Sequence, residues 1–100
     1  MCLGRPRKAS KADRRREAAA RRAAAEPLAK EIRATEALMD RLRKRIDAIE
    51  DQLADPKLYE KDPSAATQLA KERSELSAQL ARNEEKWLEM SSEYEEATAE

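Results

Sequence analysis

Glycine and histidine are almost missing from this chain, and each shortage excludes a class of site. The 100 residues include one glycine and no histidine. A phosphate-binding loop of the Walker type needs two glycines and a dinucleotide-binding fingerprint needs more, so both motifs are excluded. Without histidine there is no histidine-assisted nucleophile and no imidazole metal ligand. We therefore expect no enzymatic activity, no cofactor and no metal site.

Cysteine and long apolar runs are equally scarce. The single cysteine, Cys2, excludes an intramolecular disulfide and a thiolate cluster, and a free thiol is typical of a reducing compartment. No apolar stretch approaches the roughly 20 residues that span a bilayer. The opening Met-Cys-Leu-Gly leads into basic residues rather than into the apolar segment of a secretory signal. We expect a cytoplasmic chain that does not bind membranes.

Aromatic residues make up only 3% of the chain, whereas charged residues make up 42%. A short chain of this composition cannot build a large globular core, which leaves disorder or a narrow helical seam. Alanine, glutamate, lysine, leucine and arginine dominate, and this composition favours long helices or a coiled coil.

The net charge of zero conceals a strong polarity along the chain. Residues 1–25 hold nine Lys and Arg against two acidic residues, whereas residues 26–100 hold twelve against nineteen. Such a polarity predicts a basic arm that binds an anionic partner. The alternative is that this segment only keeps the chain soluble.

The basic arm comprises residues 1–26. Residues 1–11 are predicted to be disordered, and residues 12–25 are rich in the good helix formers alanine and arginine. This stretch has no bulky apolar face, so we expect nothing to pack against it and its helix to be marginal. Pro27 disfavours helix at Glu26 and suits the first turn of a new helix, although it is also compatible with a kink in one continuous helix.

Two series of mostly apolar residues recur at alternating steps of four and three, which is typical of coiled-coil seams. Between them lie two Asp-Pro pairs, at 55–56 and 62–63, where the aspartate suits an N-cap and the proline a first helical position. The first seam comprises Leu28, Ile32, Thr35, Met39, Leu42, Ile46, Ile49 and Leu53, and the second Leu69, Arg73, Leu76, Leu80, Asn83, Trp87, Met90, Tyr94 and Ala97.

These patterns predict an all-α fold, a two-helix antiparallel coiled-coil hairpin over residues 27–100 with a basic, partly helical N-terminal arm. The helices span about 27–54 and 63–98, and the tip spans 55–62. Leu53 then faces Leu69, and Leu28 faces Tyr94. Polar seam residues such as Arg73 are expected to fix the register.

Four features have an ordinary structural interpretation. Trp87 is expected to fill a wide seam layer opposite Thr35. At the tip, Leu58 and Tyr59 are expected to pack, leaving the lysines free. The remaining two features are charged. One is a basic cluster that we expect to be solvated, in which Lys44 can pair with Asp40. The other is an acidic tail that can pair with Arg33 or with the arm, which is a rival to nucleic-acid binding. The cluster comprises Arg41, Arg43, Lys44 and Arg45, the tail Glu93, Glu95, Glu96 and Glu100, and its partners in the arm Arg21 and Arg22.

The candidate site residues are the cations of the arm and of the tip. Guanidinium groups bind phosphate bidentately and keep their charge, so these residues can follow a nucleic-acid backbone. No aromatic residue is interleaved in the arm, so base stacking is not expected there. The candidates are Arg5, Arg7, Lys8, Lys11, Arg14, Arg15, Arg16, Arg21 and Arg22 in the arm, with Lys57 and Lys61 at the tip.

Three runs, RRREAAARRAAAEPLAKEI, LADPKLYEKDP and EEKWLEMSSEYEEA, cover about residues 12–98 and resemble the C-terminal region of ABC-F proteins. These are the soluble ATP-binding cassette proteins of the Uup and YheS type. The resemblance implies a parent with two ATPase cassettes that acts on ribosomes and translation, and a coiled coil that contacts nucleic acid, with DNA binding attributed to the Uup branch.

Residue by residue, the resemblance places five arginines in the basic linker that follows the second cassette. It places Pro56, Leu58 and Tyr59 at the tip, and Trp87 and Leu88 in the closing helix. Both cassettes are absent from these 100 residues, so we expect an excised domain, a truncated product or a remnant. The five arginines are Arg14, Arg15, Arg16, Arg21 and Arg22.

The sequence therefore predicts a module that binds nucleic acid, either DNA or ribosomal RNA on the ribosome. The alternative is a structural or partner-binding coiled coil. In that case a homodimer would form a four-helix bundle and bury seam edges such as Leu38 and Leu88.

Overall fold

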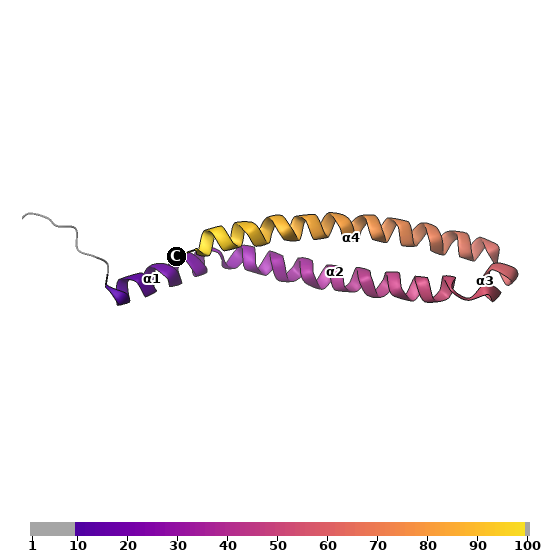
Figure 1. The fold of residues 1–100 in the computed structure, drawn as a ribbon, viewed down its shortest axis with the longest axis horizontal. Coiled ribbons are helices and arrows are strands. Elements are labelled where there is room, and N and C mark those ends of the chain that lie inside the picture. Colours follow the sequence, from indigo (N-terminus) through magenta and orange to yellow (C-terminus); the bar gives the residue numbers. More distant parts are fainter. Residues whose placement is uncertain (1–9, 100) are drawn as a thin grey trace, which may run out of the picture.

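The computed structural model describes residues 10–99, which form four helices. These are α1 (Lys11–Ala24), α2 (Glu26–Leu53), α3 (Pro56–Lys61) and α4 (Pro63–Thr98). Helices α2 and α4 lie side by side in opposite directions, with α3 at the closed end and α1 beyond the open end (Figure 1). No strand is present within residues 10–99. The predicted all-α antiparallel hairpin with a partly helical arm is confirmed, whereas the disorder predicted before Ser10 lies outside the described residues.

The two Asp-Pro pairs build the hairpin turn. Oδ1 of Asp55 accepts a hydrogen bond of 2.9 Å from the backbone N–H of Lys57, and Pro56 is the first residue of α3. Oδ1 of Asp62 accepts one of 3.0 Å from the N–H of Ala65, and α4 begins at Pro63. Each aspartate satisfies a backbone donor that would otherwise lack a partner, and each proline supplies a preset φ where no N–H is required.

The core is a single seam between α2 and α4. From the first predicted seam, Thr35, Met39, Leu42, Ile46 and Ile49 are buried, and Ile49 is 0% exposed. Helix α4 contributes mostly half-buried residues, with Ala66 and Met90 buried. Two helices alone cannot enclose one another, so burial is confined to the stripe where they face.

The second seam was predicted correctly in its middle and wrongly at two positions. Arg73 and Ala97 are exposed, whereas Glu72 and Thr98 are half-buried. A straight α-helix has 3.6 residues per turn, so its buried stripe drifts about 20° per heptad from a strict seven-residue repeat. Asn83 is half-buried, but its amide donates to the carbonyl of Gln79 in the same helix at 2.8 Å. Neither polar residue fixes the register as expected.

Two ion pairs join the helices across the seam. Arg45 donates from Nε and Nη2 to the two carboxylate oxygens of Glu72, both at 3.0 Å, and Arg43 lies 3.5 Å from Glu84. The predicted register, in which Leu53 faces Leu69, lies between the two offsets of α2 against α4 that these pairs define. The predicted basic cluster is therefore exposed but not merely solvated, since two of its members link the helices. The predicted Asp40–Lys44 pair is confirmed at 3.0 Å.

Candidate nucleic-acid interface

Helix α1 begins at a complete capping box. Ser10 Oγ accepts a hydrogen bond of 3.1 Å from the N–H of Asp13, and Asp13 Oδ2 accepts one of 3.3 Å from the N–H of Ser10. At the other end, Arg21 and Arg22 occupy the last turn, where cations favour the helix dipole. The arm therefore has local reasons to be helical up to Ala24.

Helix α1 also packs on the hairpin, which corrects the expectation that nothing packs against it. Ala18 and Ala25 are buried, Arg21 is half-buried, and α1 contacts both α2 and α4. The spacing of 18, 21 and 25 places these residues on one side of the helix. The alanine side chain is a single methyl group, which allows the backbone of α1 to lie close to α2 and α4. The small apolar face therefore suffices to anchor the arm.

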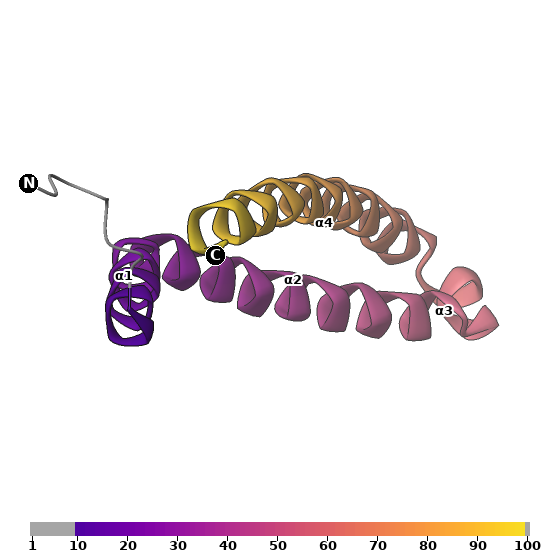
Figure 2. The same ribbon diagram turned by 60° about the vertical axis from the view of Figure 1, so that its left-hand side comes forward.

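The junction at Ala25 shows how α1 and α2 are connected just before Pro27. Ala25 has helical dihedrals (φ −87°, ψ −2°), accepts from the N–H of Ala29 at 3.0 Å and donates to the carbonyl of Arg21 at 3.0 Å. Helical hydrogen bonds therefore continue on both sides of Ala25, where the chain bends. Helix α1 leaves the hairpin at an angle (Figure 2). Glu26 is the first residue of α2, contrary to expectation, and Pro27 follows it in the first turn, where its missing N–H needs no partner.

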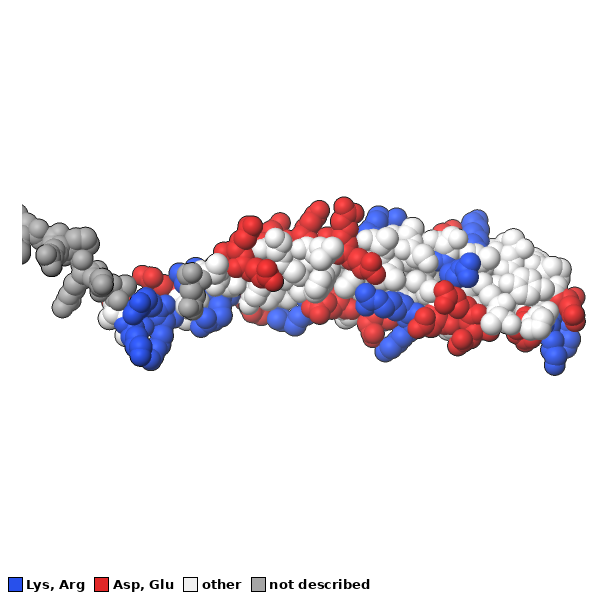
Figure 3. Space-filling view, in the orientation of Figure 1, with Lys and Arg blue, Asp and Glu red and all other residues white. Residues whose placement is uncertain are grey.

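Five basic side chains of α1 are exposed, and they form the arm surface: Lys11, Arg14, Arg15, Arg16 and Arg22. Steps of four and seven residues place Lys11, Arg15 and Arg22 on one side of the helix. Arg16 is bound to Asp13, and the pKa of that carboxyl is lowered by Arg16 first and by Ser10 second. The basic side chains gather over α1 at one end of the molecule (Figure 3).

Arg21 differs from the other arm candidates. It is half-buried, and within residues 10–99 its buried Nε has no hydrogen-bond partner. Long basic side chains commonly pack their stems on apolar surface, so Arg21 helps to hold α1 on the hairpin. The candidates Arg5, Arg7 and Lys8 lie outside the described residues.

The tip forms a second, separate basic site. Lys57 and Lys61 are exposed on α3, at the opposite end of the hairpin from α1 (Figure 1). Leu58 is half-buried as expected, but Tyr59 is 52% exposed, so the prediction that it packs was wrong. A helix of six residues buries only one side, and Tyr59 follows Leu58 on another. The structure does not bring the arm and tip candidates together.

Within residues 10–99, the acidic tail does not pair with the arm. Arg33 binds Glu26 at 2.8 Å instead of the tail. Within residues 10–99, no ion pair joins Arg21 or Arg22 to Glu93, Glu95 or Glu96, and Glu100 lies outside that range. Arg16 is therefore the one exposed cation of α1 with an ion-pair partner within residues 10–99.

Sequence reasoning missed a groove beside Trp87. The seam pattern identified Trp87 as an anchor, but Leu88 is 63% exposed and lines a hollow next to it. The sequence identified Leu88 as an uncovered seam edge, but the periodicity of one helix does not show the hollow that forms between two helices.

No helix within residues 10–99 has the length and apolar composition that crossing a membrane requires.

The model of one protein family, the ABC transporter C-terminal domain, matches residues 27–92. This range covers α2, α3 and most of α4 but not α1. No curated protein and no solved structure shows significant similarity to the chain.

Proposed function

Because the chain belongs to the ABC transporter C-terminal domain family, we propose that it is a nucleic-acid-binding coiled-coil module whose α1 helix makes the main phosphate contacts. The finer assignment to the ABC-F proteins that act in translation rests on the tip run LADPKLYEKDP and the ending EEKWLEMSSEYEEA. On this proposal the ligand is DNA or ribosomal RNA, the location is the cytoplasm, and the chain itself catalyses no reaction.

The observation that carries the proposal is the concentration of exposed cations on α1. Four of the five, Lys11, Arg14, Arg15 and Arg22, have no ion-pair partner within residues 10–99. A step of four residues advances about 6 Å along a helix, so neighbouring cations can contact different phosphates. Because α1 is anchored by Ala18 and Ala25, these side chains are presented on a fixed element.

The tip offers a second contact of a different kind. Lys57 and Lys61, four residues apart, lie on one side of α3, whereas Tyr59, which is exposed, lies on another. The lysines can contact phosphate, and the exposed ring can stack on an unpaired base, because every base has a face that stacks. A structured RNA with unpaired bases offers both groups.

Fluorescence anisotropy of labelled duplex DNA and structured RNA tests the proposal. One variant of the full chain replaces the five cations of the arm surface with glutamine. A matched control replaces five exposed cations of α2 and α4 that lack ion pairs within residues 10–99, namely Lys30, Arg41, Lys71, Arg82 and Lys86. We expect the arm variant to lose binding and the control, which has the same net charge, to keep most of it. Equal losses would refute a specific role for α1.

The alternative proposal is self-association into a helical bundle. It is supported by Leu88, which is 63% exposed, whereas Leu38 is already half-buried. Sedimentation velocity over a range of concentrations tests it, and a monomer at the highest concentration would remove it.

A further inference from the structure

Two hollows lie along a single side of the hairpin and share Trp87, and we name them together the Trp87 groove. Along α2 the lining residues 33, 36, 40 and 43 follow steps of three and four, and along α4 so do 84, 88, 91 and 95. Each set therefore lies on one side of its helix, and both hollows open on the same side of the hairpin.

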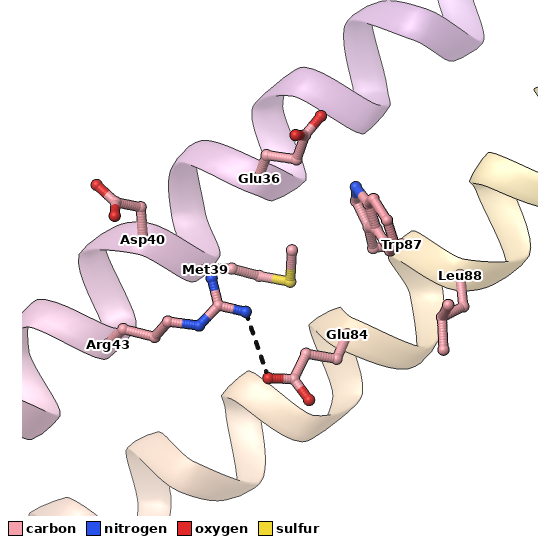
Figure 4. Close-up of a pocket in the computed structure, with 7 residues that line it drawn as sticks. All are labelled: Glu36, Met39, Asp40, Arg43, Glu84, Trp87 and Leu88. Carbon is pink, nitrogen blue, oxygen red and sulfur yellow. Dashed lines mark ion pairs between the residues drawn. The ribbon is translucent and has the colours of Figure 1, made fainter.

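The floor of the Trp87 groove is apolar. Met39 is buried, and Ile32, Trp87 and Tyr94 are half-buried. Figure 4 shows Trp87 between the two helices with Met39 beside it, and Leu88 following on the outer side of α4. Leu88 is the most exposed large apolar residue within residues 10–99. Water therefore contacts an apolar surface that the hairpin does not cover by itself.

The rim of the groove carries more carboxylates than cations. Glu36, Asp40, Glu84 and Glu95 line it, together with Arg33 and Arg43. Glu84 is paired with Arg43 and Asp40 with Lys44, whereas Glu36 and Glu95 have no ion-pair partner within residues 10–99. More carboxylates lie along the C-terminal half of α4 (Figure 3), namely Glu85, Glu89, Glu93 and Glu96.

This combination fits one kind of occupant. A valley between two packed helices accepts the apolar stripe of a third helix, and acidic rims favour lysine and arginine beside that stripe. The lining runs from Ala29 to Arg43 on α2, about 20 Å, which is the length of about 14 helical residues. We propose that the Trp87 groove docks a basic amphipathic helix of another protein.

A second copy of the chain is a poor occupant. Two copies placed groove to groove would bring acidic rims against each other, which is unfavourable. The α1 helix of a second copy has the right charge but carries only alanine as apolar residues, and its Ala18 is already buried. The proposal does not depend on nucleic-acid binding, because α1 lines neither hollow.

The test uses the emission of Trp87, the only tryptophan of the chain. The probe is a 14-residue peptide of leucine and lysine with leucines at helical steps of three and four, and its control has the same composition in scrambled order. We expect the ordered peptide to shift the emission of the full chain to shorter wavelength in a saturable way. The scrambled peptide should produce no saturable shift.

Matched variants locate the site. Glu36→Lys and Leu88→Lys should each lower the affinity at least about fivefold, whereas Glu31→Lys, an exposed residue of α2 outside the groove, should not change it. Glu36→Gln gives a milder version if a lysine disturbs folding, which circular dichroism reports. Equal binding of both peptides, or equal effects of Glu31→Lys and Glu36→Lys, would overturn the proposal. A dimer that shifts Trp87 emission without peptide would also overturn it. The arm variant should bind the ordered peptide normally, which separates this proposal from the proposed function.

Discussion

Replacing Ile49 with alanine should strongly destabilise the hairpin. Ile49 is 0% exposed and lies in α2, in the seam with α4. Truncating a fully buried isoleucine to alanine costs about 2–5 kcal/mol, made up of lost transfer energy and the cavity that remains. A seam between two helices can partly close around the gap, so we expect about 3 kcal/mol. At about 1.4 kcal/mol for each factor of ten, the unfolding constant should rise about 150-fold.

Urea unfolding followed by circular dichroism and by Trp87 emission measures this loss. With a slope of about 1–2 kcal/mol per molar urea, the midpoint should fall by about 2 M. Leu88→Ala is the control, because this residue is 63% exposed and its truncation should cost about 0.5 kcal/mol or less. If both variants lowered the midpoint equally, the seam between α2 and α4 would not be the core of the protein.

Two further predictions concern the caps and the ion pairs. Asp55→Ala and Asp62→Ala should each lower the free energy of unfolding, measured with urea, by about 1 kcal/mol, because each removes an N-cap hydrogen bond to a backbone N–H. Asparagine at either position should retain most of the stability. Equal stabilities of the alanine and asparagine variants would contradict this. The hydrogen bond from Arg45 lowers the pKa of Glu72 in the folded protein. The pair therefore contributes its full stabilisation above the unfolded-state pKa of about 4.3, and this contribution is lost as the pH falls through the lower folded-state pKa. The Glu72→Gln variant lacks this contribution, so its urea midpoint should fall less steeply below about pH 4 than that of the unmodified chain. Parallel curves of midpoint against pH would show that the pair contributes nothing.

The helix ends and the first seam were predictable because they depend on local chemistry. The Asp-Pro pairs specify where α3 and α4 begin, and the apolar steps of α2 identify its buried side. The exposure of Arg73 and Ala97 was not predicted, because a strict heptad ignores the drift of a straight helix.

The arm and the groove were harder to predict for another reason. The packing of Ala18 was missed because a single alanine in an arginine-rich run does not indicate a contact partner. The Trp87 groove depends on stripes from two helices about 50 residues apart in sequence, and the periodicity of one helix does not show what the other places beside it. The exposed cations of α1 lie where the sequence predicted, and their binding to nucleic acid remains a prediction.

The salt dependence of nucleic-acid binding tests the proposed function most directly. Four exposed cations of α1 lack an ion-pair partner within residues 10–99, and four neutralised phosphates give a slope of about −3.6 in a plot of log K against log salt for duplex DNA. The affinity of the full chain should then fall about 150-fold between 50 and 200 mM salt. An affinity that stayed flat across this range, or an equal slope after replacement of the five cations of the arm surface, would contradict the proposal that α1 binds the phosphate backbone.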